Sequence, residues 1–152
     1  MTVRVCDRGS GRDYVGVTIR TITISDRCAQ CDGPRGVDTI RNHNFHEDGD
    51  WLSVDTWKNP CGHVDMYSAV LAEARKRAEL LELHEWDELL FGGFYCMYCT
   101  PGDADDPEQN VYWPCPPLRS AGVTDEEAVA LITAERAAIE AEHRAKAEGG
   151  AV

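Results

Sequence analysis

Cysteine and histidine are the residues of this chain whose types and spacing could do chemistry. Cys28 and Cys31 form a C-x2-C turn, which lets both thiolates point at one cation. Cys61 and His63 form a second pair further along the chain. Three thiolates and one imidazole make a tetrahedral ligand set that is typical of structural zinc. We therefore predict that Cys28, Cys31, Cys61 and His63 hold one Zn²⁺ ion.

A zinc ion would dominate the stability of a small module. Structural zinc contributes on the order of 10 to 16 kcal/mol of apparent binding free energy in small peptides, whereas a whole domain is stable by roughly 5 to 15 kcal/mol. The alternative for each cysteine is a small buried apolar residue, which explains paired cysteines poorly. The fourth ligand also has alternatives. Because only one residue separates Cys61 from His63, His43 or His46 could take its place.

A second ligand set follows later in the sequence. Cys96 and Cys99 form another C-x2-C turn, and Cys115 comes after them. The fourth ligand is either His84, 12 residues before Cys96, or Cys6 from the N-terminal segment. The alternative is a buried aromatic hairpin in which the cysteines only pack. A second Zn²⁺ ion is therefore an open alternative beside the first.

The sequence gives little support for catalysis. Catalytic zinc keeps one coordination position open, whereas the first set already has four protein ligands. The H-E-x-x-H pattern of zinc proteases, the zinc-deaminase pattern and the P-loop are absent. The segment His43-Asn-Phe-His46 is similar to that of His-Asn-His nucleases, but the helix histidine of such an enzyme is here assigned to structural zinc. A metal-dependent nuclease is the least favoured alternative.

Three segments of the front half have strand patterns. Residues 14–25 alternate and are rich in β-branched side chains. Residues 37–46 and 51–57 flank an Asp-Gly turn within 47–50, which is the strongest short hairpin signal. The first C-x2-C turn is therefore expected just before a hairpin, and the second ligand pair just after it.

A helix is expected after the second ligand pair. From Asp65 the apolar residues recur with a helical period. Asp65 would lie in the first turn, where a carboxylate suits the helix dipole. The helix would run to about Leu83 or Leu90, and Gly92-Gly93 would end it in either case.

The rear half predicts a short hairpin and a final helix. Residues 94–99 and 111–115 look like short aromatic strands. Thr124 and Glu127 form a capping box that opens a helix to about Glu148. The predicted fold class is α+β, with three parts: residues 1–91 with the first ligand set, residues 92–123 with the second, and residues 124–152 as the helix and a frayed tail.

Charge is distributed unevenly over the 152 residues, whose net charge is −12. Residues 1–64 carry eight Lys/Arg against nine Asp/Glu, and residues 65–152 carry seven against eighteen. The first 14 residues contain charged side chains and no apolar core of a secretory signal, and no apolar run has the roughly 18 residues of a membrane span. We therefore expect a cytoplasmic protein in which cysteines bind metal rather than form disulfides.

The order of turn, hairpin and ligand-bearing helix resembles the treble-clef zinc finger over residues 28–83. The segments Cys28-x2-Cys31-Asp-Gly-Pro-Arg-Gly and Asp55-Thr-Trp-Lys-Asn-Pro-Cys-Gly-His-Val-Asp65 look like short zinc-binding proteins of actinobacteria and their phages. The resemblance implies knuckle ligands at Cys28 and Cys31 and helix-end ligands at Cys61 and His63. For a protein of phage origin it implies a place in the host cytoplasm or with the virion. It implies no activity, because such proteins are largely uncharacterised.

A non-enzymatic, regulatory binding module is the favoured function. It would contact nucleic acid or a nucleic-acid-handling protein, with phosphate contacts from cations around the first turn: Arg27, Arg35, Arg41 and Lys58. Each of them could equally be ordinary solvated charge. The alternative is an acidic protein-protein interaction, as in an inhibitor or assembly factor of phage type, through the negatively charged rear half.

Overall fold

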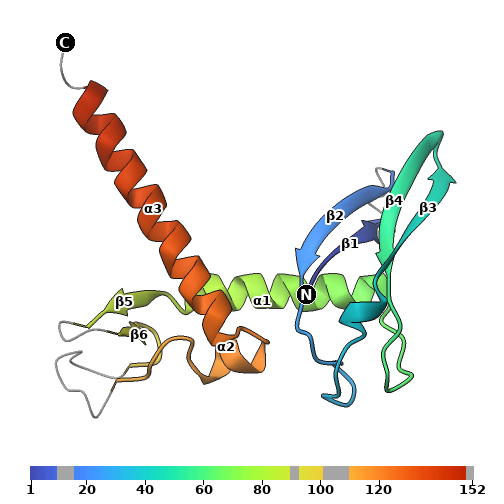
Figure 1. The fold of residues 1–152 in the computed structure, drawn as a ribbon, viewed down its shortest axis with the longest axis horizontal. Helices are drawn as coiled ribbons and strands as arrows, with labels where there is room; N and C mark the ends of the chain where they lie inside the picture. Colours follow the sequence, from blue (N-terminus) through green and yellow to red (C-terminus); the bar gives the residue numbers. More distant parts are fainter. Residues whose placement is uncertain (10–15, 90–92, 101–109, 150–152) are drawn as a thin grey trace. The chain divides into compact units, whose positions relative to one another are not determined.

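The computed structural model describes residues 1–9, 16–89, 93–100 and 110–149 (Figure 1). The chain divides into two compact units, Met1–Leu83 and His84–Val152. Each unit mixes short antiparallel strand pairs with helices, so the predicted α+β class is confirmed at this coarse level. The predicted boundary at residue 91 lies outside the described residues.

The first unit contains two antiparallel strand pairs. Strand β1 (Thr2–Asp7) pairs with β2 (Thr18–Thr23), and β3 (Arg41–Glu47) pairs with β4 (Asp50–Thr56). Asp48 and Gly49 connect β3 to β4 with φ angles of 53° and 92°, which is the left-handed conformation that a two-residue hairpin turn needs. The predicted hairpin is therefore present. Its first strand is shorter than expected, because Val37–Thr39 forms a 3-10 turn.

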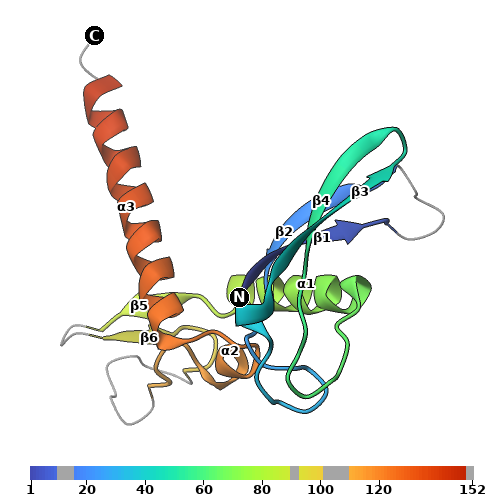
Figure 2. The same ribbon diagram turned by 45° about the vertical axis from the view of Figure 1, so that its right-hand side comes forward.

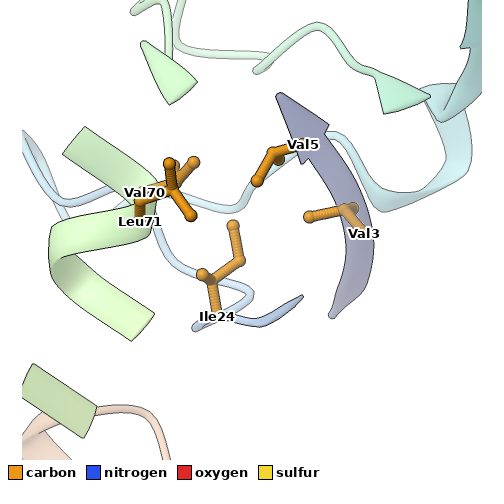
Figure 3. Packing of buried hydrophobic residues seen from close by; sticks show 5 residues of the cluster. All are labelled: Val3, Val5, Ile24, Val70 and Leu71. Atoms are coloured by element: carbon orange, nitrogen blue, oxygen red, sulfur yellow. The ribbon is translucent and has the colours of Figure 1, made fainter. Parts of the chain in front are cut away.

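Strand β1 was not predicted, although it supplies part of the core. Val3 and Val5 from β1 and Ile24 after β2 pack against Val70 and Leu71 of helix α1, which spans Tyr67–Leu83 (Figure 3). All five side chains are buried. The alternation of apolar and polar residues in TVRVCD is the signal that would have revealed this strand.

Helix α1 (Tyr67–Leu83) packs against β1 and β2 (Figures 1 and 2). It begins two residues later than predicted, since Met66 O accepts the first helical hydrogen bonds from Ala69 N and Val70 N. Asp65 therefore lies before the helix, where its carboxylate accepts hydrogen bonds from other side chains. The helix ends at Leu83, the earlier of the two predicted positions, so Gly92-Gly93 does not terminate it.

The second unit begins at His84 with a small antiparallel pair. Strand β5 (Trp86–Glu88) pairs with β6 (Phe94–Cys96). The predicted pairing of residues 94–99 with 111–115 is reduced to one bridge, between Tyr95 and Tyr112. The reason is that the chain curls into a turn directly after Cys96, where Thr100 N donates to Cys96 O at 3.0 Å.

Two helices complete the second unit: α2 (Pro116–Ser120) and α3 (Asp125–Gly149). Thr124 Oγ1 accepts a hydrogen bond from Glu127 N at 3.2 Å, so the predicted helix start is confirmed. Ala128 and Ile132 are buried, whereas residues 137–146 are exposed throughout. Among the described helices, none combines the length and apolar character that crossing a membrane requires.

Candidate metal centres

The first predicted ligand set is assembled in the first unit. The donor atoms of Cys28, Cys31, Cys61 and His63 all lie within 4.8 Å of one another. Cys28 Sγ and His63 Nδ1 are 3.6 Å apart. A tetrahedral ion with Zn–S of about 2.3 Å and Zn–N of about 2.0 Å separates two such donors by about 3.5 Å. The spacing therefore fits zinc, and His63 rather than His43 or His46 completes this set.

Backbone hydrogen bonds shape the turn that carries Cys28 and Cys31. Cys28 N donates to Gly33 O at 2.7 Å, and Asp32 N donates to Cys28 O at 2.8 Å. Asp32 adopts a left-handed φ of 56°, which short polar residues tolerate better than most. These bonds curl the chain so that both sulfurs face the same side.

The pKa of Cys28 favours the charged form that a metal binds. Hydrogen bonds, first of all from the backbone of Gln30, outweigh the effect of burial and lower this pKa to about 7. The thiolate is the form of cysteine that coordinates a cation. The backbone of the turn thus favours the thiolate form of Cys28.

Asn59 positions the second ligand pair. Its side-chain amide donates to His63 O at 3.0 Å, and its carbonyl oxygen accepts from Gly36 N at 3.2 Å. Gly36 leaves the space for this contact, since a Cβ there would lie 1.9 Å from Lys58 O. The loop between β4 and α1 therefore holds Cys61 and His63, which the sequence interpretation placed at the start of the helix. Gly62, with a φ of 80°, is unfavourable for a helical start at this point.

Arg35 was predicted to contact nucleic acid, and this prediction is wrong because the residue is buried against the ligand loop. Its side chain is fully enclosed, and its guanidinium donates to Asp65 at 3.0 and 3.2 Å and to Glu73 at 2.9 and 2.7 Å. It also donates to Ser25 O at 2.8 Å. Arg35 therefore cannot reach a phosphate. Its role is to tie the turn, the ligand loop and α1 together.

The structural roles of Arg35, Asn59 and Asp65 were not found from the sequence. Asp65 accepts hydrogen bonds from Trp57 Nε1 at 2.7 Å and from Asn59 Nδ2 at 2.9 Å, in addition to those from Arg35. No local pattern marks such a network, because its members are separated by up to 38 positions in the chain. The Asn and Asp that flank Cys61 and His63 are the weak signal that could have suggested it.

The other three predicted nucleic-acid contacts are exposed. Arg27 Nη1 donates to Asp32 O at 3.2 Å, and Arg41 Nη1 donates to Ile40 O at 2.7 Å, so each guanidinium group stays close to the backbone of nearby residues in the sequence. Lys58 is also exposed. These three positions stay candidates for a surface contact.

The second predicted ligand set is assembled in the second unit. His84 Nδ1 lies 3.5 Å from Cys96 Sγ, 3.3 Å from Cys99 Sγ and 3.4 Å from Cys115 Sγ. All four donor atoms lie within 4.8 Å of one another. His84 is therefore the fourth member, and Cys6, on β1 of the first unit, does not belong to it. The equal distances from one imidazole nitrogen to three sulfurs again fit a tetrahedral ion.

Several contacts fix the second set. Trp113 Nε1 donates to His84 O at 2.7 Å, and Cys99 N donates to Cys96 Sγ at 3.4 Å. Tyr98 meets the His84 ring edge-on, with ring centroids 4.9 Å apart. Cys115 lies at the start of α2, where Arg119 N donates to its carbonyl oxygen at 3.0 Å.

Burial disfavours the thiolate form of cysteine in the second set. It raises the pKa of the Cys115 thiol to about 12, because a thiolate without a cation is disfavoured away from water. A bound divalent cation reverses this preference and keeps a coordinating thiol deprotonated. Three sulfurs and an imidazole gathered in this way could therefore hold a metal ion.

Comparison of the chain with protein-family models, with curated proteins and with solved structures gives no match. The class of the protein is therefore inferred from its own fold and its own clusters of metal-ligating side chains. It is a small α+β protein, and the part of the chain that the structure describes contains two Cys3His clusters, one in each unit, both with a composition and spacing compatible with zinc. His43 and His46 belong to neither of these clusters.

Proposed function

We propose that this protein is a non-enzymatic binding protein in which one structural zinc ion holds each unit together. The observation that carries the proposal is the convergence of four protein donors in each cluster. Four donors fill a tetrahedral shell, whereas catalytic zinc keeps a position for water or substrate. When bound, the ion would supply the attraction that holds distant loops in place.

The arrangement of the first unit supports a treble-clef-like zinc module. A C-x2-C turn, the hairpin β3–β4, a ligand pair and α1 follow one another along the chain. We propose this relationship, and with it the kinship to actinobacterial and phage zinc proteins. The unit would differ from the usual pattern in that Cys61 and His63 precede the helix.

We propose a protein with a basic surface as the partner, such as one that handles nucleic acid. The unit from residue 84 onwards carries four Lys/Arg against fourteen Asp/Glu, and such a charge imbalance attracts a basic partner. In the first unit, a pocket of about 540 Å³ lies beside His63 and is lined by Trp57, Val64 and Met66. Val64 and Met66 are 71% and 64% exposed, which suits an apolar side chain of a partner. An inhibitor or assembly factor would have these properties.

Direct contact with nucleic acid is the second candidate. The exposed cations Arg27, Arg41 and Lys58 around the first metal centre favour it. Exposed acidic residues such as Asp26 and Asp38 alternate with them and would weaken the attraction to phosphate. A protein partner is for this reason the better supported candidate.

Native mass spectrometry tests the metal centres. We expect the purified chain to carry two zinc ions and to lose both, with its tertiary structure, on chelation. The same spectrum reports the number of subunits. A chain that has its full fold and no metal adduct would contradict the proposal.

A gel-shift titration separates the two candidate partners. Binding of short single-stranded or duplex nucleic acid at low salt, with a steep loss as salt rises, would support the second candidate. This binding should be lost when Arg27, Arg41 and Lys58 are all changed to Ala. The control is a variant in which Arg20, Arg75 and Lys76 are changed to Ala, because it removes the same number of positive charges elsewhere on the first unit. Absence of a shift at low salt would support the protein partner.

A further inference from the structure

The two metal clusters contain the same donors but differ in access to solvent. In the second cluster Cys96 and Cys115 are fully buried and Cys99 is half-buried. In the first cluster Cys28 is buried, whereas Cys31 and Cys61 are both exposed. Oxidation of a thiolate depends on its exposure. The same chain therefore holds one accessible cluster and one protected cluster.

We propose that Cys31 and Cys61 form a peroxide-reactive dithiol whose oxidation releases the metal ion of the first centre. The inference rests on the zinc centres proposed above. The two sulfurs lie within 4.8 Å of each other. Gly33 lies beside both residues, because a Cβ at this position would be 3.4 Å from Cys31 Sγ and 3.9 Å from Cys61 Cβ. No side chain at position 33 shields the pair from solvent.

The oxidant is a hydroperoxide, with hydrogen peroxide as the simplest member. One exposed thiolate attacks the peroxide, so that an S–O bond forms, the O–O bond breaks, and the leaving oxygen takes a proton to become water. The second thiolate then attacks the sulfenic sulfur. An S–S bond forms, the S–O bond breaks, and the hydroxide takes a proton to become a second water. Two thiolates thus lose two electrons in all, and one peroxide molecule gains them.

Loss of two donors would empty the first centre. Cys28 and His63 are the donors that stay, and two donors bind zinc far more weakly than four. Cys28 is 2% exposed, so it is not the first sulfur to meet the oxidant. The second centre keeps its ion under the same conditions, because only Cys99 is partly accessible there. Oxidation would therefore loosen the ligand loop and the pocket beside it without unfolding the second unit.

The experiment exposes the zinc-loaded protein to hydrogen peroxide and follows both zinc content and disulfides. Cys6→Ala serves as the background, because it removes the cysteine that belongs to neither cluster. Native mass spectrometry counts the zinc ions at each time. Trypsin then separates the cysteines into distinct peptides: residues 28–35 contain Cys28 and Cys31, residues 59–75 contain Cys61, and residues 78–119 contain the second cluster.

We expect one zinc ion to leave at least about tenfold faster than the other, since exposure controls the rate. Its loss should coincide with a cross-link between peptides 28–35 and 59–75, which fragmentation between Cys28 and Cys31 assigns to Cys31. A reductant and added zinc should restore the original mass. The second centre in the same molecule is the internal control.

Three results would overturn the inference. Both zinc ions could leave at the same rate, the disulfide could form first within residues 78–119, or Cys28 could pair with Cys31 inside peptide 28–35. All three leave the proposed zinc centres intact, because the untreated protein still carries two ions. An untreated protein without zinc would contradict the centres themselves and the inference with them.

Discussion

Arg35 Nε lies 3.0 Å from Asp65 Oδ2, and no part of the Arg35 side chain reaches solvent. The pair joins the turn that holds Cys28 to the loop that holds His63. Glu73 on α1 completes the arrangement from the helix side. An enclosed guanidinium with two carboxylates is stable only while all three groups are present, since a remaining partner would be a buried charge without compensation.

Arg35→Leu should therefore destabilise the first unit strongly. We expect a loss of about 3 kcal/mol or more in the free energy of unfolding, because the variant leaves two carboxylates without their cation. Arg35→Lys should recover little of this, since an ammonium group cannot form both bidentate contacts. Urea unfolding of the zinc-loaded protein measures the effect. Arg41→Leu is the control at an exposed position, and an equal effect of both changes would contradict the assignment.

The carboxylate of Asp65 should make the first unit sensitive to acid. Burial raises its pKa, but hydrogen bonds from Asn59, Trp57 and Arg35 outweigh this and leave the pKa below its ordinary value. A lowered folded-state pKa contributes stability above the unfolded value of about 3.9, and this stability is lost as pH falls through the folded-state pKa.

Asp65→Asn should accordingly be less stable than the wild type at neutral pH, with a difference that narrows in acid. Chemical denaturation with excess zinc, repeated from about pH 6 to about pH 3, measures this difference. Protonation of the zinc ligands affects both proteins alike, so it cancels when the free energy of unfolding of one is subtracted from that of the other. The matched control is Asp38→Asn on the exposed 3-10 turn. If the difference in stability between the two proteins widened in acid, the pKa of Asp65 would be raised in the folded state and not lowered.

The two units should lose their metal ions independently. Cys115→Ser removes one donor of the second centre, so we expect the zinc count to fall from two to one. Amide signals of β3 and β4 should be unchanged, because these strands belong to the first unit. Cys61→Ser should give the reciprocal result. Loss of both ions in either variant, seen by native mass spectrometry and amide NMR, would mean that the units fold together.

Thr124→Ala should weaken the start of α3. Its hydroxyl accepts a hydrogen bond from Glu127 N at 3.2 Å, and loss of such a cap costs about 1 kcal/mol. Thr133→Ala is a matched control within the same helix, where the hydroxyl donates to Val129 O at 2.7 Å and replacement should be nearly neutral. Thermal unfolding followed by circular dichroism would compare the two, and equal effects would exclude a capping role.

The first ligand set and the three cysteines of the second could be predicted from the sequence, because residue type and local spacing reveal metal ligands, whereas His84 and Cys6 stayed alternatives for the fourth ligand of the second set. The C-x2-C turns at Cys28 and Cys96 and the Asp-Gly hairpin are short-range patterns. The start of α3 also depends on neighbouring residues alone, and Thr124 was sufficient to place it.

The features that the sequence did not predict depend on contacts between residues far apart in the chain. Arg35 looked like a surface cation, and only Asp65 and Glu73, 30 and 38 positions away, make it an internal one. Residues 94–99 were expected to pair with residues 111–115, but the chain turns after Cys96, so only the Tyr95–Tyr112 bridge forms there and β5 is the strand that pairs with β6. In both cases local sequence preferences were outweighed by tertiary structure.

The exposed part of α3 has a consequence for how the chain can vary. Residues 137–146 contact nothing that buries them, and Glu142 and Lys146 form an ion pair 2.6 Å apart along the helix. Insertion or deletion of one helical turn there would move the end of the helix by roughly 5 Å and leave both ligand sets untouched. We therefore expect the length of this helix to vary among related chains without loss of stability in the rest of the unit.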